Sequence, residues 1–329
     1  LLAIFVFAMF LVPHNKWNNV YGLIGAILLS VLYVADVIRK RGFCENVRGI
    51  WLSFILFCIA SVTSVLISAY FSDSIRVFMF FITAFLLCLL VYGTLTSLKR
   101  LRMISMAVYW SVMICGILAL IQKRLGIAVD PALTDVALNQ STPGRAFATF
   151  GNPNNFAEFL LIFMPFALAF ALNCRYKEKR AMLVCGMAVP FVALLLTYSR
   201  SGWLGFAAAI LVFVILYNRK LFPVLILLGL CAVPLLPHSI MNRIMTIGNL
   251  KDSSSAYRLD IWSGTLYMLK YFWYRGTGLG PVAFKEVYPL YAVITARSAP
   301  HAHMLFLEVW SEMGILGLFS FVYLIWELV

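Results

Sequence analysis

Long apolar stretches alternate with short polar ones along the whole chain. Ten of these stretches have the composition of membrane helices, and several are near the short end of the roughly 17–25 residues that cross a bilayer. The pattern predicts an all-α, polytopic integral membrane protein of about ten transmembrane helices. The first and last stretches are apolar up to the ends of the sequence, so we expect both ends to be trimmed. The ten stretches are Leu1–Val12, Val20–Ile38, Ile50–Tyr70, Ile75–Leu95, Met103–Ile121, Phe156–Leu172, Ala181–Tyr198, Gly202–Tyr217, Leu221–Leu236 and His303–Leu328.

A long polar segment separates the last apolar stretch from the others. We therefore divide the chain into nine transmembrane helices at 1–236, a loop at 237–302 and a last helix at 303–329, all within one integral membrane domain. Within the loop, Ala256–Tyr271 and Val282–Val293 place apolar residues at helical spacing. Both segments are predicted to form amphipathic helices that lie on the membrane surface.

Composition favours a membrane protein over two other classes. The 329 residues are 63% hydrophobic and 12% charged, whereas a soluble domain has roughly 25% charged residues. The net charge is +13, but the basic residues fall between apolar stretches rather than on one soluble face, which argues against nucleic-acid binding. The seven cysteines have no CxxC or metal-ligand spacing, so we expect free thiols that pack as small apolar residues.

Basic residues give the predicted orientation. Four short connections hold 13 of the 26 Lys and Arg residues, and they alternate along the predicted helices so that all four face the same way. The positive-inside rule makes that side cytoplasmic. The outer side then receives a middle loop at 122–155, the turn at Ser199–Ser201, the long loop and all four histidines. The connections contain Arg39, Lys40, Arg41 and Arg48; Lys99, Arg100 and Arg102; Arg175, Lys177, Lys179 and Arg180; and Arg219 and Lys220.

Three arginines at the outer boundary are candidate anion ligands. Arg200 lies in a polar turn between two apolar stretches, where its planar guanidinium could bind phosphate bidentately or could simply reach the lipid headgroups. Two helices on either side of it, or one bent helix, both fit the pattern. Arg258 opens the first amphipathic segment and has two alternatives to phosphate, a lipid headgroup and a local pair with Asp260. Arg145, the third candidate, lies earlier in the chain, shortly before a cluster of asparagines.

That cluster contains asparagines at the predicted start of a helix. Asn152, Asn154 and Asn155 could bind sugar hydroxyls, or they could cap the helix after a turn.

Two histidines and two carboxylates lie at the start of the last apolar stretch. His301 or His303 could take a proton from an attacking hydroxyl, or either could be a hydrogen-bonded edge residue. Two histidines at i and i+2 without a matched third ligand make a poor metal site, so no metal is predicted. Glu308 and Glu312 share one helix face, where each would be paired with an arginine such as Arg200 or protonated.

These residues resemble the motifs of the O-antigen ligase and polymerase superfamily of bacterial surface-glycan glycosyltransferases. Arg200-Ser201-Gly202-Trp203-Leu204 is similar to the R-x3-L element of that family, and His303-Met304, nine residues, Gly314, two residues and Gly317 is similar to its H-[N/S/Q]-x9-G-x2-G element. The resemblance covers 145–318 in a consistent order, including the turn at 151–154 and the run from Arg258 to Gly280. Met304 and Leu318 depart from the usual residues at their motif positions.

The resemblance implies a GT-C-like helical fold and a metal-independent inverting glycosyltransferase without a soluble cofactor. The donor would be a glycan on undecaprenyl diphosphate, and the acceptor would be a hydroxyl of a glycan, lipid or protein at the outer face of the bacterial cytoplasmic membrane. In this reading His303 is the base, His301 is its stand-in and Glu308 positions or tunes it. The diphosphate ligands are Arg200, Arg258 and Arg145, and the glycan ligands are Asn152, Asn154 and Trp262.

Three other functions remain as alternatives. A polymerase would share every motif with a ligase, and only the product would distinguish them. A transporter of lipid-linked glycans would favour inverted halves and charges near the membrane centre, which the sequence does not display. A non-catalytic membrane scaffold would have no need of the histidines.

Overall fold

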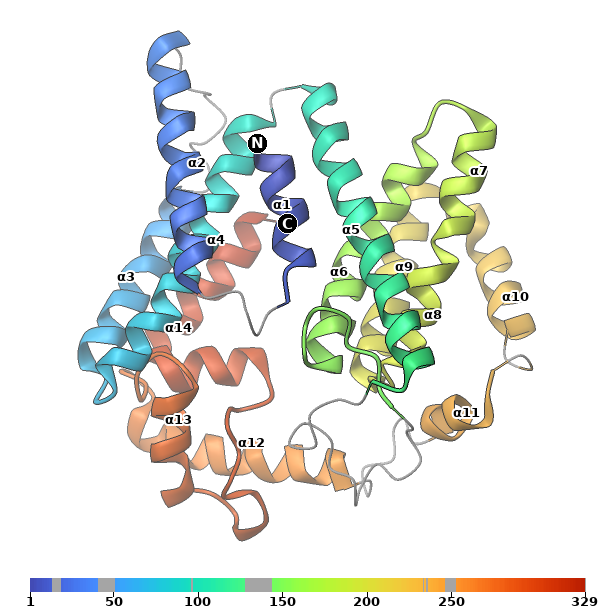
Figure 1. The fold of residues 1–329 in the computed structure, drawn as a ribbon. Coiled ribbons are helices and arrows are strands. Elements are labelled where there is room, and N and C mark those ends of the chain that lie inside the picture. Colours follow the sequence, from blue (N-terminus) through green and yellow to red (C-terminus); the bar gives the residue numbers. More distant parts are fainter. Residues whose placement is uncertain are drawn as a thin grey trace. The chain divides into compact units, whose positions relative to one another are not determined.

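The computed structural model describes residues 1–13, 19–40, 51–95, 97–127, 144–232, 234, 236–245 and 253–328. These ranges contain helices and no strand, which confirms the all-α prediction (Figure 1). Seven described helices are long and apolar enough to cross a membrane. They are α2 (Asn19–Lys40), α4 (Phe71–Thr94), α5 (Leu98–Leu125), α6 (Pro153–Leu172), α7 with α8 (Lys177–Gly186 and Ala188–Leu196), α9 with η3 (Arg200–Asn218 and Arg219–Leu221) and α14 (Leu305–Leu328).

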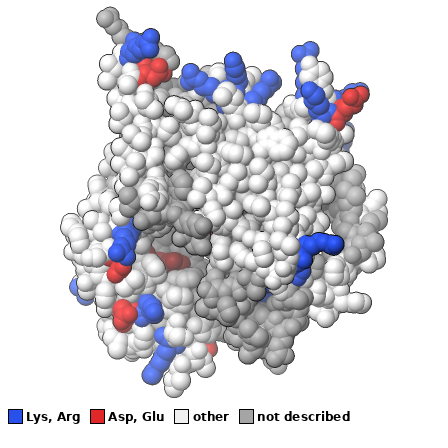
Figure 2. All heavy atoms as spheres, viewed as in Figure 1, with Lys and Arg blue, Asp and Glu red and all other residues white. Residues whose placement is uncertain are grey.

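Each of the ten predicted apolar stretches falls on helix, but three of these helices are shorter than a typical span. They are α1 (Leu2–Leu11), α3 (Trp51–Ile67) and α10 (Phe222–Ala232). The number of ten transmembrane helices therefore stays a prediction. Figure 2 shows that the charged side chains gather at the ends of helices and that the surface over the spans is almost uncharged on the face drawn.

Proline and turn residues explain a break within one span and the boundary between two others. Between α7 and α8 the helix breaks at Met187, because Pro190 has no N–H with which to continue the ladder. α8 ends at Leu196 and α9 begins at Arg200, so the two apolar stretches around Arg200 are separate helices rather than one bent helix.

The chain divides into two compact units, each made of two separate segments. The first unit comprises Leu1–Asn18 and Ser97–Gly248, and the second comprises Asn19–Thr96 and Asn249–Val329.

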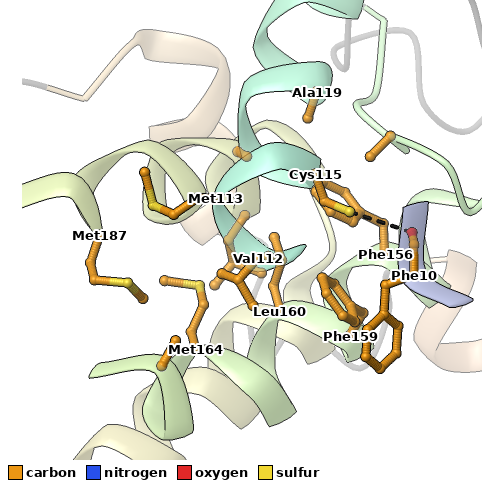
Figure 3. Packing of buried hydrophobic residues seen from close by; sticks show 14 of the residues in the cluster. Phe10, Val112, Met113, Cys115, Ala119, Phe156, Phe159, Leu160, Met164 and Met187 are labelled. Atoms are coloured by element: carbon orange, nitrogen blue, oxygen red, sulfur yellow. Dashed lines mark hydrogen bonds between the residues drawn. The ribbon is translucent and has the colours of Figure 1, made fainter. Parts of the chain in front are cut away.

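The core of the first unit is formed where α1, α6 and α8 pack on α5. Val112 and Cys115 of α5 lie among Phe10, Phe156 and Leu160 (Figure 3). α5 and α8 approach closely because α5 has a glycine at 116, where an added Cβ would lie 3.0 Å from Pro190. The Cys115 thiol bonds to the Phe10 carbonyl oxygen at 3.6 Å and is a free cysteine, in agreement with the sequence.

The second unit has an apolar core in its spans and a smaller one outside them. α3, α4 and α14 pack through aromatic side chains such as Phe57, Phe85 and Phe321. A second cluster, which we call the outer apolar cluster, joins α12 (Ser253–Phe272) to α13 (Pro281–Val287), to η6 (Ile294–Ala296) and to the start of α14. Figure 1 shows α12 lying crosswise to α3 and α4.

The two amphipathic helices predicted in the long loop have different outcomes. The helix predicted at Ala256–Tyr271 is α12, which has Leu259 and Leu266 exposed, and its location on the membrane surface stays a prediction. The helix predicted at Val282–Val293 is confirmed in its first half and wrong in its extent. α13 ends at Val287 and is followed by a short 3-10 turn, η5 (Tyr288–Leu290), because Pro289 cannot donate the hydrogen bond that would continue the α-helix.

Candidate functional site

Arg145 forms a buried link between two helices of the first unit. Its Nε donates to the carbonyl oxygen of Thr197 at 2.8 Å, and its Nη2 donates to Oδ1 of Asn154 at 2.7 Å. The loop around it is fixed by Gln122, which bonds twice to the backbone of Ala148. Burial, with the charge of Arg243 added, lowers the pKa of Arg145 to about 10, so the guanidinium is still charged at neutral pH. Arg145 therefore has a structural role, and the anion-binding role stays a prediction.

The asparagine cluster has the capping function that was the simpler of the two expectations. Asn152 is the N-cap of α6, and its side chain accepts a bond from the N–H of Asn154 at 2.8 Å. Asn154 in turn accepts from Arg145, while its side chain is otherwise exposed. Contacts of either amide with a glycan remain predicted.

The turn before Arg200 is strained and tightly packed. Tyr198 has a positive φ of 52°, which is uncommon for a residue with a bulky side chain. Its hydroxyl lies 3.1 Å from Oγ of Ser239, and the Lys123 amine lies 5.7 Å from the centre of its ring. Ser199 then caps α9, whose first residue is Arg200. Such strain is often found at functional sites, and the sequence offered no signal for Tyr198 beyond an aromatic residue next to a polar turn.

Gly202, two residues after Arg200, lies where α9 packs closely on α6. An added Cβ at Gly202 would lie 2.7 Å from Cβ of Ala157, so any larger residue would separate α9 from α6.

In the second unit, two imidazoles and a carboxylate come together. The ring centres of His301 and His303 are 3.9 Å apart, and Nδ1 of His301 lies 3.7 Å from Oε2 of Glu308. His303 has a positive φ of 52°, the third such non-glycine residue of the described chain after Ala148 and Tyr198. The sequence placed these three side chains on one segment, and the structure brings them into one cluster.

The electrostatics of this cluster favour a neutral His303. Burial, with smaller effects from His301 and the Arg258 guanidinium, lowers the pKa of His303 to about 4. The imidazole is therefore uncharged at neutral pH and has a lone pair with which to accept a proton. Arg258 influences His303 from α12, so the structure brings this predicted arginine close to the histidines. Its expected alternative partner, Asp260, accepts a bond from Oγ1 of Thr295 at 2.6 Å.

Trp262 lies one turn after Arg258 on α12. Its indole packs against the outer apolar cluster and is half-buried. The indole Nε1 and Nδ1 of His301 are both buried without a hydrogen-bond partner in the described part of the chain. Unsatisfied buried donors and acceptors are rare in folded proteins.

The last predicted transmembrane helix differs from the expectation at two points. It begins at Leu305 rather than His303, and its backbone leaves helical geometry at Gly314, where φ is 67° and ψ is −167°. Figure 1 shows the two parts of α14 running in different directions. An alanine at 314 would collide with the backbone of Tyr274, and this explains the first glycine of the second motif.

A glycine-rich loop at Gly276–Gly280 satisfies the backbone groups exposed by this break. Thr277 and Gly278 donate to the carbonyl oxygens of Ser311 and Glu312 at 2.8 and 3.1 Å. The Gly280 N–H donates to the Glu312 carboxylate at 2.8 Å. The Glu312 carboxylate thus bonds to the backbone of the loop, a partner that neither expectation, pairing with an arginine or protonation, included.

No three metal-ligating side chains come together in the ranges that the structure describes. His14 and the middle loop at 128–143 lie outside those ranges.

A comparison with protein families gives a match that agrees with the motifs. The family described as O-antigen ligase matches residues 185–322, which include Arg200, Arg258 and His303. This match supports the assignment of the chain to the O-antigen ligase family, and with the seven apolar helices it indicates a multi-pass membrane protein. No curated protein and no solved structure matches the chain.

Proposed function

We propose that the protein is a membrane glycosyltransferase of the O-antigen ligase type. It would transfer a glycan from undecaprenyl diphosphate to an acceptor hydroxyl at the outer face of the cytoplasmic membrane, with inversion and without a metal. The observation that supports this proposal most is the cluster of His301, His303 and Glu308 beside Arg258, because it combines a neutral base with a cation. The family match to 185–322 supports the same class of activity.

The proposed step moves one proton and one glycan. His303 takes the proton of the acceptor hydroxyl as that oxygen attacks the anomeric carbon of the donor. The bond between this carbon and the diphosphate oxygen breaks, and its electron pair leaves with the diphosphate. Attack from the side opposite the leaving group inverts the anomeric centre. The imidazolium then returns its proton to solvent.

The neighbours of His303 have distinct proposed roles. The Glu308 carboxyl group lies beside the His301 imidazole. When ionised, this carboxylate would stabilise the positive charge that develops in the imidazole pair. Arg258 would bind the departing diphosphate, since a guanidinium binds phosphate oxygens bidentately and stays charged. Arg200 and Arg145 are retained as proposed diphosphate ligands on residue type and family resemblance, not on a distance to His303. Asn152, Asn154 and Trp262 are retained as proposed glycan ligands on the same grounds.

A polymerase is the second candidate, because the motifs that match are shared by ligases and polymerases. The acceptor would then be the end of another lipid-linked glycan. Purified protein supplied with lipid-linked repeat units alone separates the two: a ladder of products that stays on the carrier indicates a polymerase, and transfer that requires a different acceptor indicates a ligase.

A further inference from the structure

One side of α12 is exposed although it carries leucine and tyrosine side chains. Leu259 and Leu266 are 44% and 51% exposed, and Tyr267 and Tyr271 are 47% and 56% exposed. Lys270 lies on the same side, with its amine 5.2 Å from the centre of the Tyr267 ring. The opposite side packs on the outer apolar cluster through Ile261, Thr265, Met268 and Leu269.

The residues that follow α12 continue this surface. Trp273 and Tyr274 are 52% and 56% exposed. The Arg275 guanidinium lies 5.3 Å from the centre of the Phe272 ring and 6.0 Å from that of Tyr274. We refer to Leu259, Leu266, Tyr267, Lys270, Tyr271, Trp273, Tyr274 and Arg275 as the α12 face.

Contacts within the second unit fix the level of this face. Directly after Arg275, the loop at Gly276–Gly280 packs against the turn between α3 and α4. Oγ of Ser74 donates to the Leu279 carbonyl oxygen at 2.6 Å, and a Cβ at Gly278 would meet the Ser68 side chain. α3 ends at Ile67, and α4, a candidate span, begins at Phe71. The end of α12 therefore lies where the spans of this unit end.

The chemistry of the α12 face suits that level. Tyr and Trp side chains gather at membrane–water interfaces, because each has an apolar ring and a polar group. Lys and Arg extend their charges to phosphate groups at the same depth. We propose that the α12 face docks on the phospholipid headgroup layer of the outer leaflet. A surface for glycan alone would have no need of leucines at 259 and 266 or of a location at the ends of the spans.

Docking would fix the depth of His301 and His303 relative to the headgroup layer. The packed side of α12 shares its cluster with Ala299, Ala302 and Leu307, which flank His301 and His303. A helix held in the headgroup layer would keep the imidazoles beside that layer, where the diphosphate of a lipid-linked donor lies. This consequence rests on the proposed function, whereas docking itself does not.

The test uses the full chain in nanodiscs of phosphatidylcholine and phosphatidylglycerol. Tryptophan emission is measured for the wild type, for Trp273→Phe and, as the control, for Trp262→Phe, whose indole is half-buried against the outer cluster. Two quenchers are compared: lipids brominated on the acyl carbons next to the headgroup, and iodide in the water. We expect the emission lost in Trp273→Phe to be quenched by the brominated lipid and not by iodide.

Replacing Tyr267 and Tyr271 by serine should weaken docking and move the Trp273 emission toward iodide quenching. Emission from Trp273 that iodide quenches and brominated lipid does not would overturn the proposal. Protection of Trp273 from iodide by a carrier-free glycan, without lipid quenching, would identify a glycan surface instead and would also overturn it. Neither measurement needs turnover, so transfer activity with unquenched Trp273 refutes docking alone, and quenched Trp273 in an inactive wild type refutes the proposed function alone.

Discussion

The Glu308 carboxylate lies 3.7 Å from Nδ1 of His301, and the His301 ring lies 3.9 Å from that of His303. A residue in the first turn of α14 thus places a carboxyl group beside the pair of imidazoles. This relationship bears on Met304, where the family usually has a residue that can form a hydrogen bond. His301 contacts His303 directly, and a positive φ fixes the backbone of His303, so neither constraint depends on the side chain at 304.

Removal of the proposed base should slow transfer strongly without preventing donor binding. General base catalysis contributes about 10²- to 10⁴-fold, so His303→Ala should lower the transfer rate by about that factor. Glu308→Gln should cause a smaller loss, because it removes charge stabilisation but leaves the base. Rates of glycan transfer and binding of the lipid-linked donor are measured in parallel. Equal losses of donor binding and of transfer in His303→Ala would assign this residue to binding instead.

The transfer rate should fall on the acid side (the acid limb of the pH profile) at a lower pH than it would with a histidine of ordinary pKa as the base. With a pKa of about 4, His303 stays neutral as the pH falls from 7 to 5, and the base is lost only below that range. Arg258→Gln removes a charge that disfavours the imidazolium, so the limb should move to higher pH. A wild-type limb near 6.5, the ordinary value for histidine, would contradict the burial of His303.

The same shift affects stability in a defined window. The unfolded chain binds a proton at His303 near pH 6.5 and the folded chain does so only near 4. The unfolded state therefore holds more protons between these values, and stability should fall as the pH drops from about 6.5 to about 4. The fall should be smaller in His303→Gln, which does not titrate. If the unfolding temperatures of the wild type and of His303→Gln fell identically with pH, protonation of His303 would not be the cause.

Gly314 should be intolerant of a side chain. A left-handed backbone costs an L-residue about 1–2 kcal/mol, and Cβ would in addition collide with the Tyr274 backbone, so Gly314→Ala should lower the unfolding temperature. Gly229 in α10 is the matched control, because nothing lies within 4 Å of an added Cβ there. Gly229→Ala should be neutral or stabilising. Similar unfolding temperatures for the two variants would contradict the described kink in α14.

Substitution of Arg145 should affect mainly stability, and substitution of Arg200 should affect mainly donor binding. Arg145→Gln loses bonds to Thr197 and Asn154 in a buried setting, so it should destabilise the protein by about 1–3 kcal/mol. Arg200 is the first residue of α9 and is half-buried. Arg200→Gln should therefore weaken donor binding more than it lowers the unfolding temperature. The unfolding temperature and the dissociation constant for the donor are compared for both variants. A stable Arg145→Gln protein with weakened donor binding would make Arg145 primarily a ligand.

The sequence predicted features that depend on local composition. Apolar stretches located the helices, and the cap at Asn152 followed from residue type. Features that depend on distant contacts were missed. The break at Gly314 arises because the loop at Gly276–Gly280, more than thirty residues earlier, bonds to α14. Hydrophobic periodicity cannot report such a contact, and for the same reason it gave no sign of the strained Tyr198.

The candidate site was predicted in its residue types more than in its geometry. His301, His303 and Glu308 were expected together because they are close in sequence. The sequence did not indicate that Glu308 lies on His301 or that Arg258 lowers the pKa of His303, since both depend on how α12 and α14 pack.

The most direct measurement follows a labelled glycan on undecaprenyl diphosphate in bilayers that contain the purified protein, an acceptor and a chelator. We predict that the label leaves the carrier for the acceptor with inverted anomeric configuration, and that His303→Ala binds the donor but leaves the label on the carrier. Transfer by His303→Ala at the wild-type rate, or a wild type that binds the donor and never breaks its glycosidic bond, would contradict the proposed function.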